Sequence, residues 1–170
     1  MPLVKNATTI ADPFVHLSDD AELPLDGAVL VSAARFLQDP EALIGRNSPL
    51  GVIWPNNRAV DDLVPYLDRL AVVALVYPSF RDGRAHSQAR LLRERYGFRG
   101  ELRATGQILR DQFVFLLRNG FDAFEVKKDA DAAAFAATAK RYTVFYQPSS
   151  DGRASAWQRR LQARHSESAS

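Results

Sequence analysis

The chain of 170 residues contains no cysteine, and this absence excludes several kinds of chemistry. Disulfide cross-links, thiolate-ligated zinc, iron–sulfur clusters held by this chain and a nucleophilic thiol all require cysteine. Histidine is scarce too: His16, His86 and His165 lie far apart and match no metal-ligand spacing, so we expect no metal site. Redox chemistry would therefore depend on a partner or on a bound organic cofactor, for which a flavin is one candidate.

Long apolar runs are also missing, since no stretch approaches the about 20 residues that span a bilayer. The first twenty residues carry aspartates and two prolines and lack the pattern of a signal peptide. We therefore expect a soluble, cytoplasmic protein with no membrane partner. The formal net charge of +2 gives no indication of nucleic-acid binding, and neither GxGxxG nor GxxxxGK[ST] is present.

What the chain does have is a regular alternation of apolar runs and helical patterns. With 46% hydrophobic residues it can bury a full core, so one domain is expected. The predicted strands are 28–32, 50–54, 71–77, 100–106, 121–126 and 142–146, and helices are predicted within 33–45 and over 61–70, 86–97, 107–120 and 129–141. We expect Phe113 and Phe115 on a broad buried face of the helix over 107–120, and Ser87 as the N-cap of the helix over 86–97. This order predicts an α/β domain with a mainly parallel sheet of about six strands, either open or half-barrel-like. Residues 1–27 read as an irregular or hairpin-like lead-in, 28–153 as the domain, and 154–170 as a basic helix with a frayed tail.

Polar residues gather in the loops that follow the predicted strands, where α/β folds bind ligands. A nearly identical turn occurs twice there, as "DGRA" at 82–85 and 151–154. Each turn places an arginine near a helix start, where the helix dipole disfavours a cation unless an anion is bound. The alternative is that both arginines reach solvent or pair with the neighbouring aspartate. The candidate anion- or ligand-binding residues are Arg81, Asp82, Arg84, Ser87, Arg103, Thr105, Gln107 and Arg153.

Between residues 81 and 118 every lysine-or-arginine position is an arginine, and the arginines outnumber the acids. Such a surface would suit an acidic redox partner, and the candidate docking residues are Arg90, Arg93, Arg95 and Arg99. The alternative is a solvated helix face paired with Glu94. Glu101 and Arg103 alternate along a strand and share a face, which favours a structural ion pair over an acid–base couple. His86 beside Ser87 has no third group to orient it, so no catalytic residue is assigned.

The segment 82–126 resembles a bacterial family of unassigned biochemical function. Its runs "DGR", "ARLLRER", "GELRATG", "RDQ" and "GFDAFE" are closely similar to runs found in that family. Family members are described as oxidoreductases or accessory proteins of assimilatory sulfite reduction, because they are encoded beside sulfite reductase. The resemblance implies a pathway and identifies no catalytic residue.

Three functions follow as alternatives. The first is an accessory or electron-transfer-associated protein of assimilatory sulfite reduction that docks on sulfite reductase or on its acidic electron donor. The second is a small anion- or flavin-binding enzyme that uses the strand-end loops, and the third is a non-catalytic scaffold. An oxidoreductase activity would rest on the resemblance alone.

Overall fold

A computed structural model describes residues 2–6, 8–126, 132–135, 137–138, 145–146, 148–149 and 154–167. The strands are β1 (Leu3–Lys5), β2 (Thr8–Ile10), β3 (Val15–His16), β4 (Val29–Ser32), β5 (Leu50–Trp54), β6 (Val72–Tyr77), β7 (Glu101–Gly106) and β8 (Ala123–Glu125). The helices are α1 (Ala33–Gln38), α2 (Pro40–Ile44), the 3₁₀ helix η1 (Val60–Arg69), α3 (Arg84–Arg90) and its π-helical continuation η2 (Leu91–Arg95), the 3₁₀ turn η3 (Arg110–Gln112), α4 (Phe113–Arg118) and α6 (Ala156–Glu167).

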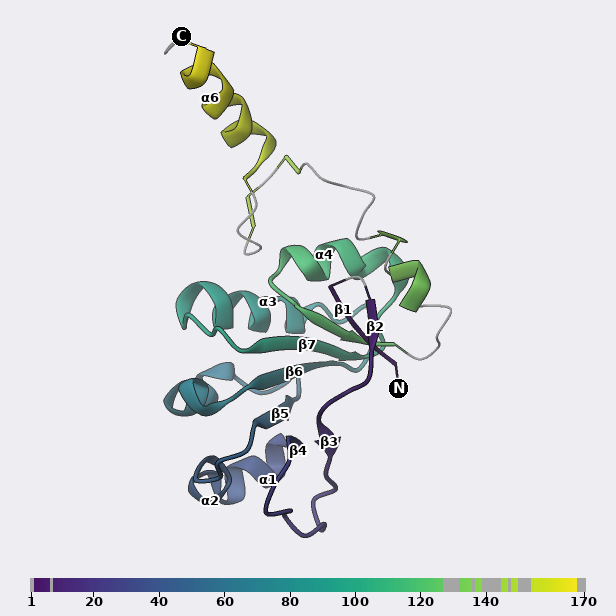
Figure 1. Ribbon diagram of the computed structural model, residues 1–170, viewed down its shortest axis with the longest axis vertical. Helices are drawn as coiled ribbons and strands as arrows, with labels where there is room; N and C mark the ends of the chain where they lie inside the picture. Colours follow the sequence, from purple (N-terminus) through teal and green to yellow (C-terminus); the bar gives the residue numbers. More distant parts are fainter. Residues whose placement is uncertain are drawn as a thin grey trace.

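The strands form one mixed sheet in the order β2-β1-β8-β7-β6-β5-β4-β3 (Figure 1). β3 to β8 run parallel to one another, whereas β1 pairs antiparallel with both β2 and β8. The expected α/β class and the mainly parallel core are confirmed, but the count of six strands is wrong. The described sheet has eight, because residues 1–27 contribute three short strands.

β6 lies between β5 and β7, parallel to both, as the apolar run at 71–77 predicts. Its side chains are buried on both faces, apart from partly buried Val76. Five of the six predicted strands are present as β4 to β8. The sixth, 142–146, lies mainly outside the described residues, as does most of the helix predicted over 129–141.

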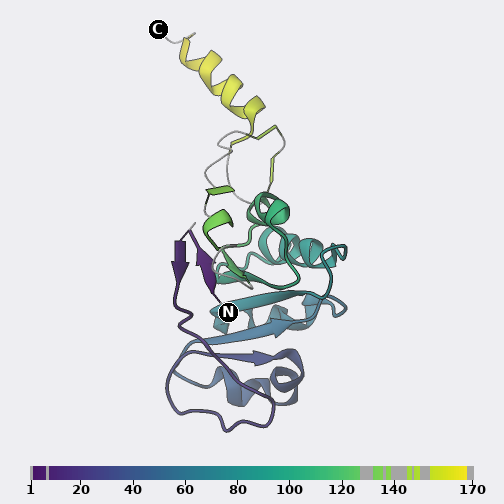
Figure 2. The same cartoon turned by 90° about the vertical axis from the view of Figure 1, so that its right-hand side faces the viewer.

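The described helices that pack on the sheet lie on one side of it, and the N-terminal segment lies on the other (Figure 2). Alternate strand residues such as Val31, Val52 and Leu102 enter the large core under the helices. Leu30, Val72 and Ala74 face the opposite way and form a small cluster with Phe14. The two faces are therefore covered by different parts of the chain.

The sheet curls, as its connectivity requires. β2 and β3 lie at opposite edges, yet only residues 11–14 join them. A flat sheet of eight strands would separate its edge strands by about 34 Å, whereas the joining chain spans about 17 Å at full extension. The edges must therefore approach each other in a half-barrel, and the joining chain crosses the concave face. We name residues 11–17 the strap.

Several helix boundaries differ from the prediction for local reasons. The helix expected before residue 45 divides at Asp39, which ends α1 and caps α2 because Pro40 cannot continue a helix. Pro65 lies inside η1, which is a 3₁₀ helix. α3 begins at Arg84 after Gly83, so Ser87 lies within the helix and is not its N-cap. Among the described helices, none is both long and apolar enough to cross a lipid bilayer.

Gly106 closes β7 in a conformation that suits glycine. Its φ is +93°, and a Cβ there would lie 2.4 Å from the Tyr77 carbonyl oxygen, which accepts from Gln107 N at 2.7 Å. We expect Gly106→Ala to lower the free energy of unfolding in urea by about 2 kcal/mol, through backbone strain and this clash. Gly97→Ala is the matched control, because Gly97 has a φ of +65° with nothing within 4 Å of the added Cβ, and should cost about 1 kcal/mol. Equal losses of unfolding free energy in the two variants would show that the clash with the Tyr77 carbonyl oxygen contributes nothing.

Candidate functional site

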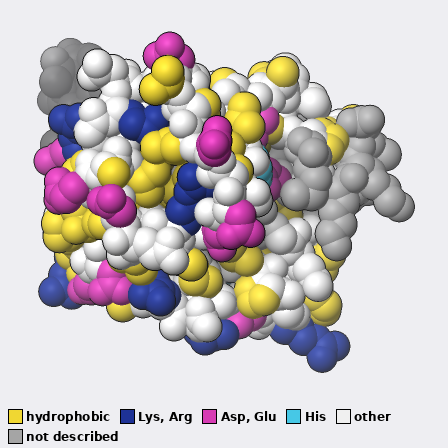
Figure 3. Space-filling model, turned by 90° about the horizontal axis from the view of Figure 1, so that it is seen from below, with side chains coloured by type: hydrophobic (Ala, Val, Ile, Leu, Met, Phe, Trp, Pro, Cys, Tyr) yellow, Lys and Arg dark blue, Asp and Glu magenta, His cyan; other side chains and the backbone are white. Residues whose placement is uncertain are grey.

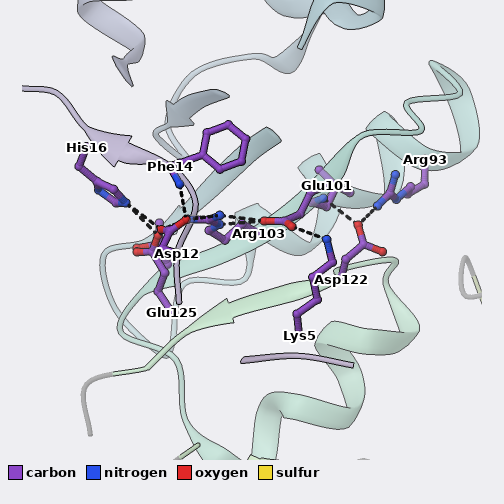
Figure 4. Close-up of polar contacts among 11 residues, drawn as sticks. Lys5, Asp12, Phe14, His16, Arg93, Glu101, Arg103, Asp122 and Glu125 are labelled. Atoms are coloured by element: carbon purple, nitrogen blue, oxygen red, sulfur yellow. Dashed lines mark hydrogen bonds and ion pairs between the residues drawn. The ribbon is translucent and has the colours of Figure 1, made fainter. Parts of the chain in front are cut away.

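The polar centre of the molecule is Arg103, in the middle of the concave face (Figure 4). Alternation along β7 places Glu101, Arg103 and Thr105 on this face, while Leu102 and Ala104 enter the core under the helices. The Arg103 side chain is 0% exposed. Its guanidinium contacts three carboxylates, those of Asp12, Glu101 and Glu125, at 2.6 to 3.1 Å. The expected Glu101–Arg103 ion pair is thus present, within a larger network.

Asp12 approaches Arg103 from the strap and binds it through both oxygens. Arg103 Nη1 donates to Oδ2 at 2.6 Å and Nη2 to Oδ1 at 3.1 Å. The Phe14 N–H also donates to Oδ1, at 3.0 Å, and the Phe14 ring lies 5.7 Å from the guanidinium carbon. Burial disfavours the Asp12 carboxylate, but the hydrogen bonds from Arg103 and Phe14 outweigh it, so the pKa of Asp12 is lowered.

Glu125, the last residue of β8, is the buried acid of the cluster. It accepts from Thr105 Oγ1 at 2.6 Å and from Arg103 Nη1 at 3.1 Å. Burial raises its pKa, yet the hydrogen bonds from His16, Thr105 and Arg103 prevail and lower that pKa to about 2. Glu125 is therefore an ionised acceptor and is poorly suited to donate a proton near neutral pH.

His16 completes the cluster at its solvent side. Its Nε2 lies 3.5 Å from both Asp12 Oδ2 and Glu125 Oε1, and its side chain is 45% exposed. The hydrogen bond to Glu125 outweighs burial and raises the pKa of His16. The ligand atoms of these three residues lie within 4.8 Å of one another, close enough for a metal ion to bridge. Arg103 Nη1 already contacts both carboxylates, so the guanidinium fills the role that a cation would have.

Two further ion pairs continue the network toward the amino ends of the strands. Lys5 of β1 contacts Glu101 at 2.7 Å. Arg93, whose side chain is only 14% exposed, bonds Asp122 and donates to the carbonyls of Phe98, Gly100 and Gly120. Arg93 is one of the four predicted docking residues, and its guanidinium ties η2 to the starts of β7 and β8.

The remaining docking candidates are exposed on α3, η2 and the loop that follows. Arg90 pairs with Glu94 at 2.7 Å, as the solvated-face alternative expected, and Arg95 lies over the Tyr96 ring. Arg99 is exposed beyond η2. These three arginines, without Arg93, make up the outer arginine face.

The strand-end candidates are divided between two places. Arg103 and Thr105 lie in the buried network, where Arg103 presents no surface to a ligand. Arg84 donates to Asp82 at 2.7 Å, and this hydrogen bond lowers the pKa of Asp82. The other exposed candidates are Arg81 and Ser87, on either side of the first DGRA turn, and Gln107 directly after β7. Arg153, the arginine of the second DGRA turn, lies outside the described residues.

Sequence reasoning missed Asp12, His16 and Glu125. Asp12 meets Arg103 across 91 positions of sequence, and no local pattern indicates such a contact. A usable signal existed for Glu125 alone, since a charged residue ends an otherwise apolar strand next to the polar strand β7.

Comparison with known proteins identifies the family. The profile of a bacterial protein family of unknown function, DUF934, matches residues 51–157, well over half of the chain. The chain belongs to this family. No curated protein and no solved structure matches it. The matched range contains Arg103, Thr105 and Glu125 of the network, whereas the strap lies before it.

Proposed function

We propose that the protein is an accessory, electron-transfer-associated component of assimilatory sulfite reduction that acts by binding sulfite reductase or its acidic electron donor. The pathway comes from the resemblance of residues 82–126 to proteins described in that role. Docking, in preference to catalysis, comes from the way in which the described residues use their charges.

The observation that carries the docking proposal is that the charged groups of the buried network are already paired with one another. Arg103 is saturated by three carboxylates, and Glu125 is held ionised by three donors. A catalytic acid or base needs a pKa near the working pH and access to a substrate. Glu125 has neither, so the network stabilises the fold and leaves the surface to bind partners.

The outer arginine face is the part of the described surface best suited to an acidic partner. It carries Arg90, Arg95 and Arg99 along one helix and its following loop. By contrast, the end of the molecule that carries α1 and α2 shows acidic and basic side chains intermixed with hydrophobic ones (Figure 3). Charge complementarity mainly sets association rate and specificity, which suits a transient redox encounter.

The anion- or flavin-binding alternative has less support. Arg84, the arginine of the first DGRA turn, is already paired with Asp82. An anion would have to displace this carboxylate before it could use the guanidinium.

We expect Arg90→Gln, Arg95→Gln and Arg99→Gln in one variant to slow association with purified sulfite reductase or its electron donor about tenfold at low ionic strength. Surface-plasmon-resonance kinetics over a salt series would measure this, because exposed charges are screened beyond about 8 Å at physiological ionic strength. Arg58→Gln is the control, since Arg58 pairs with Asp62 at (i, i+4) just as Arg90 pairs with Glu94. Binding that is insensitive both to salt and to the triple variant would refute docking through this face.

The pathway needs its own test, so that a failed docking assay is not mistaken for a wrong pathway. Deleting the gene should impair growth on sulfate and spare growth on cysteine. Equal growth of the deletion strain on both sulfur sources would reject the sulfite-reduction assignment, whatever the binding assay shows.

A further inference from the structure

The strap backbone forms few hydrogen bonds with the sheet that it crosses. β3 pairs with β4 through two positions, Val15↔Val29 and His16↔Leu30. All residues of β2 and β3 are exposed, so neither strand adds buried side chains to the core. The strap backbone donates from Val15 N to Ala28 O and from Leu17 N to Leu30 O. Segments with few buried contacts open locally at low cost.

Three side chains hold the strap against the concave face, and each contacts a different group. Asp12 binds Arg103, Phe14 packs with Leu30, Val72 and Ala74, and His16 lies between Asp12 and Glu125. The aspartate and the phenylalanine together cover Arg103. Strap opening would therefore uncover Arg103, Thr105 and Glu125.

The charges around His16 balance only when the imidazole is protonated. Facing it are Asp12 from the strap and Glu125 from β8, with Arg103 of β7 behind both; Glu101 of β7 and Lys5 of β1 extend the network. Its β4 neighbour is the apolar Leu30. Three carboxylates face two permanent cations, which leaves a net charge of −1 with neutral His16 and zero with His16 protonated.

We propose that the strap, residues 11–17, is a latch that a proton on His16 holds closed over the concave face, and that loss of this proton loosens it and exposes Arg103. The imidazolium joins a strap carboxylate to a sheet carboxylate. Neutral imidazole removes this link and leaves Arg103 as the cation between Asp12 and Glu125.

The direction of the pH response follows from the raised pKa of His16, which is caused first by its hydrogen bond to Glu125. The stabilisation is complete below the ordinary histidine pKa of about 6.5 and is lost as pH rises through the raised value. Asp12 and Glu125 have lowered pKa values, so both stay ionised over this range. The latch should therefore close toward mildly acidic pH and loosen toward alkaline pH.

The test is an NMR titration of the full chain from about pH 5.5 to about pH 8.5, which follows the His16 ring together with exchange protection of strap amides Val15 and Leu17. Protection factors, corrected for the intrinsic exchange rate, should fall about two- to fivefold as His16 loses its proton, the scale of a half-exposed ion pair. Amides of β6 report global stability and should not follow the His16 titration.

Three variants make the test decisive. His16→Gln should give the low strap protection at every pH, while His86→Gln, which alters a histidine on α3, should preserve the pH response. Glu125→Gln should lower the pKa of His16, because a neutral amide replaces the carboxylate that accepts its main hydrogen bond. Strap protection that stays constant while His16 titrates, or a pH response that survives His16→Gln, would overturn the latch.

Discussion

Replacing Arg103 with methionine is expected to lower the free energy of unfolding by about 3 to 5 kcal/mol. The substitution keeps much of the side-chain volume but removes the cation that touches Asp12, Glu101 and Glu125 together. Glu125 is 4% exposed and would keep its charge without its guanidinium partner. A buried charge left unpaired costs far more than the original pair contributes, and this sets the size of the loss. Urea denaturation followed by circular dichroism would measure it.

Two matched variants show how much of this loss comes from the charge, from the hydrogen-bond geometry and from the burial of Arg103. Arg103→Lys retains the charge but presents a single ammonium where a planar fork now reaches three carboxylates, so an intermediate loss of about 1 to 3 kcal/mol is expected. Arg90→Met removes a cation from an exposed pair with Glu94 and should cost less than about 1 kcal/mol. If Arg103→Met and Arg90→Met cost the same, the network is not a major source of stability.

Four of the strands β4 to β8 could be predicted as apolar runs bounded by turns, and the more polar β7 could be predicted from its place between two helical patterns. These five strands follow one another across the sheet. The strands before residue 28 could not be counted in advance, since β1 to β3 are two or three residues long and β2 and β3 bury nothing. β1 is positioned by pairing with β8, far along the chain, and β3 is positioned by pairing with β4 across an irregular loop. The curl of the sheet depends on the short connection, residues 11–14, that joins the two edge strands β2 and β3.

Arginine was the residue type whose roles were hardest to predict. Arg93 and Arg103 look like surface cations in sequence, yet one is largely buried and the other fully so. The spacing of Glu101 and Arg103 along a strand did predict their pair, because alternate strand residues share a face. The partners Asp12 and Asp122 come from elsewhere in the chain, 91 and 29 positions away, and local spacing carries no information about such contacts.

The second large effect on the free energy of unfolding is expected on α4, which carries Phe113 and Phe115. Both were expected on one broad apolar face, but residues two apart on a helix point about 200° apart. Phe113 is 1% exposed, with its ring centroid 4.3 Å from that of Phe124 and 4.4 Å from that of Phe135. Phe115 is 69% exposed. The prediction that Phe115 is buried is therefore wrong.

We expect Phe113→Ala to lower the free energy of unfolding by about 3 to 5 kcal/mol, because it removes a fully buried ring together with its two edge-on aromatic contacts and leaves a cavity. Phe115→Ala, the same substitution on the same helix, should change it by no more than about 0.5 kcal/mol. Both values come from one urea series, and Phe113→Leu should recover about half of the loss by refilling part of the cavity. Since both variants are Phe→Ala substitutions on one short helix, the difference between them mainly measures how the Phe113 ring packs against Phe124 and Phe135. A Phe115→Ala loss as large as that of Phe113→Ala would show that α4 is rotated from its described position on the sheet.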